Sequence, residues 1–267
     1  MKISGLTSIY HKLVFEVRYD FGLLYLDRCG ATANRIMETF PEWVLQDESV
    51  NPQNAPLINV TTGTHFNFGG LKYDFNLDQP IREEAALTPE DIKSFFAQVD
   101  SVSRIVHEEL ELKHFTREGF RVWYVFGTQS EEESHKWISS LGVFKIGESL
   151  PKAFSGTLDN HGHVVVVNAK DRKFRISVTA VERTEQLDIG SHILRIIPRK
   201  LPAKQREVLV EKLKAKRRLL ANPSYGVMID VDAYIERPIE IAPVDFMTRS
   251  IQMIEESLPI AFSGGGS

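Results

Sequence analysis

Four segments of this sequence alternate between apolar and polar residues, and this alternation constrains the fold more than any other feature. They are residues 13–19, 71–77, 173–180 and 227–235. Successive side chains of a β-strand point to opposite faces, so each segment predicts a strand with one buried and one solvated face. Such strands are typical of antiparallel or mixed sheets, because strands buried on both faces are apolar throughout.

Other segments repeat their apolar residues at helical spacing. Thr88 followed by Pro89, Glu90 and Asp91 predicts a capped helix start, and Ser130 with Glu133 predicts a capping box. We expect strands at 12–20, 57–62, 64–68, 71–78, 119–127, 153–158, 162–168, 173–183 and 225–236. We expect helices at 22–40, 88–110, 130–141, 202–221 and 243–258.

This order of elements predicts an α+β protein with antiparallel or mixed sheets flanked by helices. The first half follows the element order of a ferredoxin-like βαββαβ unit with an extra strand. The second half repeats a similar order if the strand at 119–127 is shared. We therefore expect two ferredoxin-like halves, an N-terminal one at 1–128 and a C-terminal one at 129–262, followed by a flexible tail at 263–267.

The sequence lacks the motifs of several common chemistries. A single cysteine, Cys29, excludes an internal disulfide framework and a Cys-rich zinc site, and its helical stripe predicts a small buried apolar residue. We find no P-loop, Rossmann, HExxH or G-x-S-x-G pattern, and expect no cofactor and no metal site. No apolar run is long enough to span a membrane and the start lacks a signal-like segment, so a cytoplasmic location is expected.

Positive charge is concentrated in one stretch. The whole chain has a formal charge of −4, yet residues 195–218 hold ten Lys or Arg and two acids. The cations of the predicted helix 202–221 include Lys204, Arg206, Lys212, Lys214, Lys216, Arg217 and Arg218. Three interpretations remain open: a nucleic-acid contact, a contact with an acidic protein surface, or a solvated surface helix.

Asp230 and Asp232 fall on one face of the predicted strand 225–236, together with Tyr234. Two carboxylates roughly 7 Å apart could begin a Mg²⁺ site. The alternative is a polar face whose aspartates pair with arginines on neighbouring strands, such as Arg175 or Arg18. The sequence supplies no further ligand at a fixed spacing.

The most aromatic strand, 119–127, carries the third candidate site. If its other residues face the core, Arg121 and Trp123 point outward, which is a composition found at protein interfaces. The alternative is a strand covered by helices on both faces.

Three stretches together resemble a sporadically distributed family of uncharacterised bacterial proteins. They are an opening strand Leu13-Val14-Phe15-Glu16-Val17-Arg18-Tyr19, a central Gly119-Phe120-Arg121-Val122-Trp123-Tyr124, and a late Val227-Met228-Ile229-Asp230-Val231-Asp232-Ala233-Tyr234 followed by a helix. This sequence lacks the asparagine usual after the central strand. The resemblance implies no activity, and the family's patchy distribution suggests mobile or defence-related loci.

These observations predict a non-enzymatic protein-interaction scaffold, in keeping with a component of a bacterial anti-phage defence system. The alternative is a nucleic-acid-binding protein, or a metal-dependent nuclease, that uses helix 202–221 with Asp230 and Asp232. A small-molecule site between the halves is a third option. The expected partner is a protein, and nucleic acid is the alternative partner.

Overall fold

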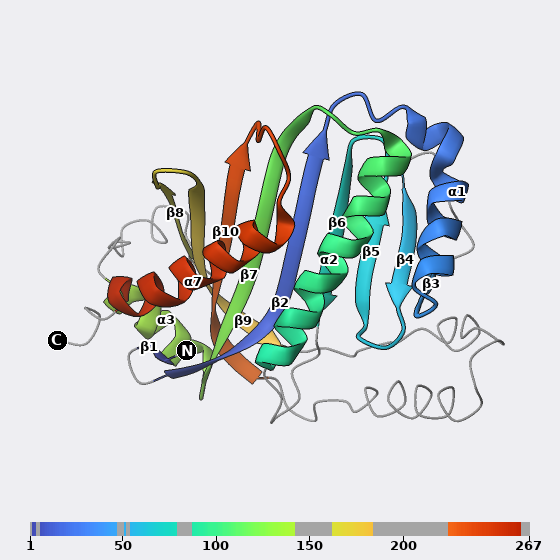
Figure 1. Cartoon of the computed structure of the whole chain (residues 1–267). Helices are drawn as coiled ribbons and strands as arrows, with labels where there is room; N and C mark the ends of the chain where they lie inside the picture. Colours follow the sequence, from blue (N-terminus) through green and yellow to red (C-terminus); the bar gives the residue numbers. More distant parts are fainter. Residues whose placement is uncertain are drawn as a thin grey trace, which may run out of the picture.

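The chain forms an α+β fold built on one antiparallel sheet, as seen in a computed structural model (Figure 1). The structure describes residues 2–3, 6–46, 51, 54–78, 87–141, 162–183 and 224–262. Nine strands follow the order β3-β4-β5-β6-β2-β7-β10-β9-β8, and β1 pairs with the start of β2. The central strands β2 and β7 are the longest, with 14 residues each.

The strands are β1 (Lys2–Ile3), β2 (Leu6–Tyr19), β3 (Trp43–Leu45), β4 (Ala55–Asn59), β5 (Thr64–Phe68), β6 (Lys72–Asp78), β7 (Phe115–Thr128), β8 (Gly162–Asn168), β9 (Lys173–Arg183) and β10 (Ser224–Glu236). The helices are α1 (Leu24–Thr39), α2 (Pro89–Leu110), α3 (Glu131–Ser140) and α7 (Pro243–Ala261). None of these described helices is long and apolar enough to cross a membrane.

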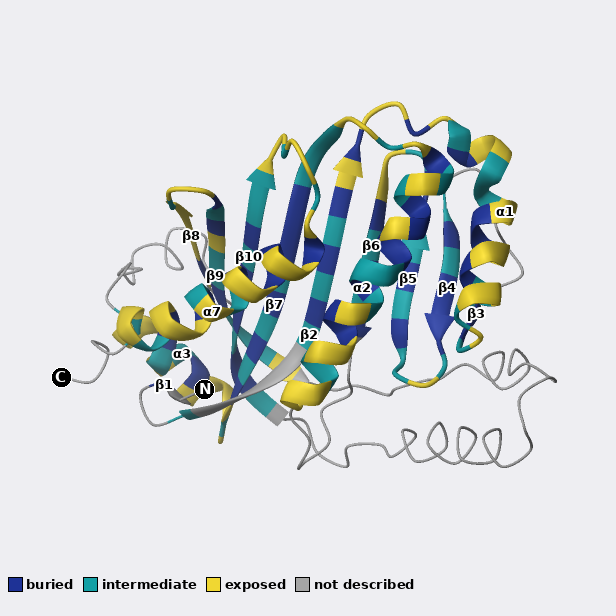
Figure 2. Cartoon of the chain, viewed as in Figure 1, coloured by how far each residue is buried: buried dark blue, intermediate teal, exposed yellow. Residues whose placement is uncertain are grey.

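Three of the described helices, α1, α2 and α7, lie on the same side of the sheet (Figure 1). The apolar side chains of the alternating strands form one continuous core with these helices, in which Phe15, Phe75, Phe120 and Ile229 are fully buried. Figure 2 shows buried positions alternating with less buried ones along the strands. We call this side of the sheet the helix side and the opposite side the outer face. The two faces follow directly from the period-two alternation of the sequence.

Helix starts follow the predicted capping. Thr88 Oγ1 accepts a hydrogen bond from the Asp91 backbone, and the Asp91 carboxylate accepts one from the Thr88 backbone, so α2 begins with a complete capping box. Ser130 caps α3 in the same way, but the Glu133 carboxylate binds the backbone N–H of Gln129 instead of Ser130. Cys29 is half-buried and packs against the core, close to its predicted role.

The observed strand order can be compared with the two predicted ferredoxin-like halves. In the first half, β5-β6-β2-β7 are neighbours in that order. In the second half, β10 lies between β7 and β9, and the same sheet runs through both halves. Two ferredoxin-like halves, and the boundary at 128/129, therefore stay a prediction. The predicted strand 153–158, helix 202–221 and tail 263–267 lie outside the described residues.

Candidate functional site

The outer face carries most of the polar side chains that the strands bring together. Alternation places them in rows along five neighbouring strands, and the rows meet because the strands are antiparallel and in register. The residues are Lys72, Asp74 and Asn76 on β6, Lys12, Glu16 and Arg18 on β2, Arg117, Arg121 and Trp123 on β7, Asp230, Asp232 and Tyr234 on β10, and Lys173 and Arg175 on β9.

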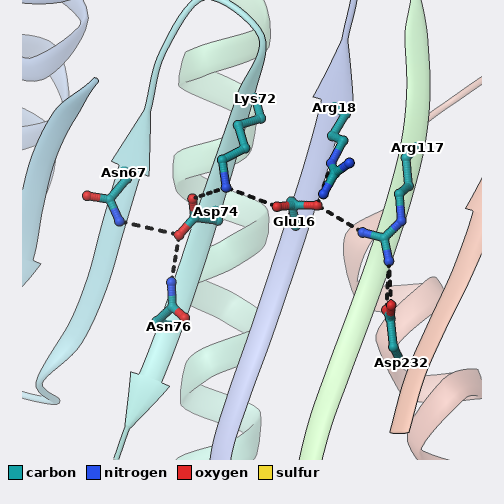
Figure 3. Close-up of polar contacts among 8 residues, drawn as sticks. All are labelled: Glu16, Arg18, Asn67, Lys72, Asp74, Asn76, Arg117 and Asp232. Atoms are coloured by element: carbon teal, nitrogen blue, oxygen red, sulfur yellow. Dashed lines mark hydrogen bonds and ion pairs between the residues drawn. The ribbon is translucent and has the colours of Figure 1, made fainter. Parts of the chain in front are cut away.

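Glu16 is the centre of a ladder of ion pairs that crosses β6, β2, β7 and β10 (Figure 3). It lies directly opposite Asp74, and like charges in that position repel each other. The positive charge of Lys72 offsets this repulsion, because its Nζ lies 3.0 Å from a Glu16 oxygen and 3.3 Å from an Asp74 oxygen. Arg18 Nε donates to the other Glu16 oxygen at 2.7 Å.

Arg117 extends the ladder to β10. One terminal nitrogen lies 2.9 Å from Glu16 Oε1, and the other lies 2.8 and 2.7 Å from the two oxygens of Asp232. The guanidinium lies over Gly119, where an added Cβ would be 2.6 Å from Arg117 Nη1. The missing side chain at Gly119 therefore leaves the space through which Arg117 reaches Asp232.

Arg121 forms a second, bidentate pair with Asp230, in which Nε donates to Oδ1 at 2.7 Å and Nη2 donates to Oδ2. A bidentate guanidinium–carboxylate contact fixes both planes and is stronger than a single ion pair. The pair raises the pKa of Arg121, since the hydrogen bond to Asp230 stabilises the charged form.

Two aromatic rings on the outer face each lie next to two cations. Lys12 Nζ and Arg121 Cζ are 5.1 and 5.2 Å from the centroid of the Trp123 ring. Arg117 Cζ and Lys173 Nζ are 5.0 and 6.0 Å from the centroid of the Tyr234 ring. These distances are within cation–π range, and the cations come from three different strands.

In the Lys173–Glu236 pair of the outer face the acid is the more exposed partner, at 57% against 39%, but in three other pairs the cation is more exposed. Asp230 is 8% exposed while its partner Arg121 is 40% exposed, and Asp74 is 14% exposed while Lys72 is 51% exposed. Glu16 follows the same rule beside Arg18, at 15% against 55%. The carboxylates lie against the strands and the cationic ends point to solvent, so in these pairs positive charge faces outward.

The ladder also sets the protonation of its acids. Burial opposes the ionisation of Glu16, but hydrogen bonds from Arg18 and Lys72 hold its pKa below the usual range. Burial raises the pKa of Asp232, although the charge of Arg117 opposes that rise.

The structure shows where the site residues predicted from the sequence lie and which partners they have. Asp230 and Asp232 do share a face, but they bind Arg121 and Arg117 on β7, not Arg175 or Arg18. Arg121 and Trp123 lie on the outer face, as alternation predicts, and the described helices α1, α2 and α7 lie on the other side. The seven cations named above for the predicted helix 202–221 fall outside the described residues.

Within the part of the chain that the structure describes, no group of three or more His, Cys, Asp or Glu side chains could hold a metal ion. His65 Nδ1 lies 2.8 Å from Gln46, His107 Nε2 lies 2.8 Å from Tyr73, and these two histidines do not meet. The carboxylates of the outer face are instead neutralised by arginine and lysine.

A second polar group, which sequence reasoning missed, lies on the helix side. Glu118 is 2% exposed, and its Oε1 has no hydrogen-bond partner among the described residues. Burial raises its pKa from 4.5 to about 8, although the nearby charge of Arg172 opposes the rise. Tyr73 and His107 pack close by, and burial lowers the pKa of His107 to about 4.

Arg172 does not pair with Glu118. Its Nη1 donates to Ser250 Oγ at 2.8 Å and to the Phe246 carbonyl at 3.3 Å, and its Nη2 donates to Asp171 at 2.6 Å. The guanidinium thus holds the β8–β9 turn against α7, and the Glu118 carboxyl is left as a buried group without an ion pair.

We compared the chain with family models, curated proteins and solved structures. No family model, no curated protein and no solved structure matched the chain. The resemblance to the sporadically distributed bacterial family stays a prediction, and the candidate site depends on its own geometry.

Proposed function

We propose that this chain is a non-enzymatic interaction protein and that its outer face binds an anionic macromolecule. The observation that carries the proposal is the uneven exposure of charge there. Asp230 and Glu16 lie close against the strands, whereas their partners Arg121 and Arg18 are exposed. A surface that offers cations to solvent attracts negative charge and steers its approach.

The state of the carboxylates supports the non-enzymatic part of the proposal. A hydrolytic metal site needs carboxylates that are free to bind the ion. Asp230 instead accepts a bidentate contact from Arg121, and both oxygens of Asp232 accept hydrogen bonds from one terminal nitrogen of Arg117. Such pairs organise a rigid surface, and a rigid surface reduces the entropic cost of binding.

A protein with an acidic surface is the second candidate partner. Arg121 and Trp123 favour it, because arginine and tryptophan are enriched at the energetic centres of protein interfaces. A scaffold role in a bacterial defence system fits this candidate, and the resemblance described above is its only support.

Neutralising exposed cations on the outer face tests the proposal. The variant Arg18→Gln/Lys173→Gln/Arg175→Gln removes three positive charges from this face. The matched control Arg35→Gln/Lys93→Gln/Arg104→Gln removes three from α1 and α2. Binding of polyglutamate, heparin and oligonucleotides is measured by fluorescence anisotropy or competition.

We expect the outer-face variant to lose about tenfold in affinity for at least one anionic probe, and the control to keep it. Equal losses in the two variants would mean that only net charge matters, and would overturn the proposal. Failure of the wild-type chain to bind any of the probes would also overturn it. Mg²⁺-dependent cleavage that disappears in Asp230→Asn would contradict its non-enzymatic part.

A further inference from the structure

Five connections between strands and helices lie at the same end of the sheet. The register puts the ends of β2 and β10 next to the starts of β6, β7 and β9. We call these connections the loop end, which is the upper end of the sheet in Figure 1. They are residues 20–23, 69–71, 111–114, 169–172 and 237–242.

The loop end carries strongly exposed apolar side chains. In the part of the chain that the structure describes, the five most exposed large apolar side chains are Ile239 (99%), Phe21 (78%), Ile260 (76%), Leu71 (74%) and Leu23 (73%). All but Ile260 belong to the loop end, and we call these four side chains the apolar tips. Exposed apolar side chains are normally scattered singly, so their gathering in one place marks an interaction surface.

The backbone of the loop end adopts conformations that L-residues rarely take. The non-glycine residues described with a positive φ are Phe21 (60°), Glu111 (50°) and Arg237 (51°), and each belongs to a different connection of the loop end. Such conformations cost free energy and cluster at functional sites. Phe21 is also highly exposed, so burial in the core does not account for its conformation.

Contacts between the connections hold the loop end in place. The Asp20 N–H donates to the His114 carbonyl at 2.9 Å, and the Phe21 and His114 rings pack edge to face with their centroids 5.7 Å apart. Gly22 lies so close to Gly70 that an added Cβ would collide with the Gly70 carbonyl oxygen. The apolar tips are therefore presented on a packed frame, which reduces the entropic cost of binding.

The charges of the loop end cancel, unlike the exposed cations on which the proposed function of the outer face depends. Its five connections contain four Lys or Arg and four acids, namely Lys113, Lys170, Arg172 and Arg237 against Asp20, Glu111, Asp171 and Glu240. A partner of the loop end is therefore recognised by its apolar character, because a surface without net charge does not steer ions of one sign.

We propose that the loop end binds the surface of a lipid bilayer, with the apolar tips inserted between the headgroups and the acyl chains. Phenylalanine and leucine are typical of protein surfaces that enter this interface, and each tip that leaves water adds to the affinity. The loop end is separate from the outer face, so this inference goes beyond the proposed function and does not depend on it.

The shape and composition of the loop end favour lipid over a protein partner or a second copy of the chain. Its tips come from three connections that span β6 to β10, roughly 14 Å at the spacing of neighbouring strands. Four side chains offer a few hundred Å² of apolar surface, less than the roughly 800 Å² that each partner buries in a stable protein complex. Protein interfaces also favour Trp, Tyr and Arg over Leu at their energetic centres.

Flotation of the full chain with vesicles tests the inference. One set of vesicles is phosphatidylcholine alone, and the other also contains phosphatidylserine; both are used at about 0.1 and about 1 M salt. Phe21→Asn/Ile239→Asn removes two tips, and asparagine tolerates the positive φ of Phe21. Leu23→Asn/Leu71→Asn removes the other two. The matched control Val164→Asn/Ile260→Asn removes two exposed apolar side chains outside the loop end.

We expect the wild-type chain to bind neutral vesicles with an affinity that does not fall at the higher salt, because apolar insertion is not screened. Each tip variant should lose about 10- to 100-fold in affinity, and the control should bind like wild type. Thermal unfolding confirms that each variant is folded, and light scattering without vesicles reports self-association.

Failure of the wild-type chain to bind neutral vesicles would overturn the inference, as would folded tip variants that bind like wild type. Binding only to vesicles with phosphatidylserine, lost at the higher salt, would overturn it and assign the contact to cations instead. Self-association that disappears in the tip variants, without vesicle binding, would make the loop end an interface between copies. Vesicle binding by a chain that binds no anionic polymer would leave this inference standing while the proposed function fails.

Discussion

Two glutamates on neighbouring strands have pKa values shifted in opposite directions, one on each side of the sheet. Glu16 is on the outer face of β2, and Glu118 is on the helix side of β7, next in the chain to Gly119, which lies directly opposite Glu16. Both are largely buried, at 15% and 2% exposure. Hydrogen bonds from Arg18 and Lys72 overcome burial and lower the pKa of Glu16, whereas burial raises the pKa of Glu118 to about 8.

The difference teaches that hydrogen bonds from cations can outweigh burial at a carboxyl, as they do at Glu16, although at Asp232 burial still raises the pKa beside Arg117. Arg172 is close enough to oppose the shift of Glu118, but its hydrogen bonds go to α7 and to Asp171. With a pKa of about 8, the Glu118 carboxyl on the helix side is largely protonated at neutral pH.

The largest expected effect comes from Glu118→Gln, measured as unfolding free energy against pH. The pKa of Glu118 is higher in the folded than in the unfolded chain, so its contribution to stability is fully present below pH 4.5 and is lost as pH rises toward 8. A shift from 4.5 to about 8 corresponds to a loss on the order of 5 kcal/mol. The glutamine variant should show no such loss.

Glu16→Gln is the matched control for this comparison, and its expected difference has the opposite sign. The lowered pKa of Glu16 means that its ion pairs stabilise the fold at neutral pH and stop doing so as pH falls through that lowered value. Glu16→Gln should therefore be less stable than wild type at pH 7 and equally stable in acid. If the two glutamine variants gave the same pH dependence, the comparison of the two faces would be wrong.

A smaller effect is expected from Arg121→Met, which leaves the Asp230 carboxylate without its bidentate partner. Removing one member of a buried pair costs about 3–5 kcal/mol, and the 40% exposure of Arg121 reduces our expectation to about 2 kcal/mol. Arg104→Met on α2 breaks an exposed pair with Asp100 and should cost less than about 0.5 kcal/mol. Urea unfolding at pH 7 measures both, and equal costs would mean that the outer-face pair is an ordinary surface contact.

Most of the fold could be predicted because the alternation is a local signal. The expected strands 64–68, 162–168 and 173–183 coincide with β5, β8 and β9. Two strands were missed, β1 and β3, because two or three residues are too few to show a period of two. The start of β2 was placed six residues late, since a register shift between Tyr10 and Lys12 interrupts the alternation there.

Less of the candidate site could be predicted, because it depends on which strands are neighbours. Alternation correctly placed Asp230 and Asp232 on one face, and nothing local indicated that β7 lies beside β10 and supplies their arginines. The basic stretch 195–218 contains no aromatic residue among its cations. On the sheet, by contrast, aromatic rings and cations are brought together from four strands that are distant in sequence, β2, β7, β9 and β10.

The smallest predicted effect is that of Gly119→Ala. It tests whether the ion pairs of Arg117 depend on the absence of a side chain at Gly119 on β7. The new methyl group would lie within 3 Å of the Arg117 guanidinium and displace it from Glu16 and Asp232. We expect a loss of about 1 kcal/mol in unfolding free energy. Gly127→Ala on the same strand is the control, because nothing lies within 4 Å of an added Cβ there.

A double-mutant cycle separates loss of the ion pairs from simple crowding. If Gly119→Ala acts by displacing the guanidinium, its cost should largely disappear in an Arg117→Met background, where no guanidinium remains to be moved. A cost that stays the same in both backgrounds would show that the methyl group strains the strand itself. In that case Gly119 would matter for packing, and the link between Glu16 and Asp232 would depend on the reach of Arg117 alone.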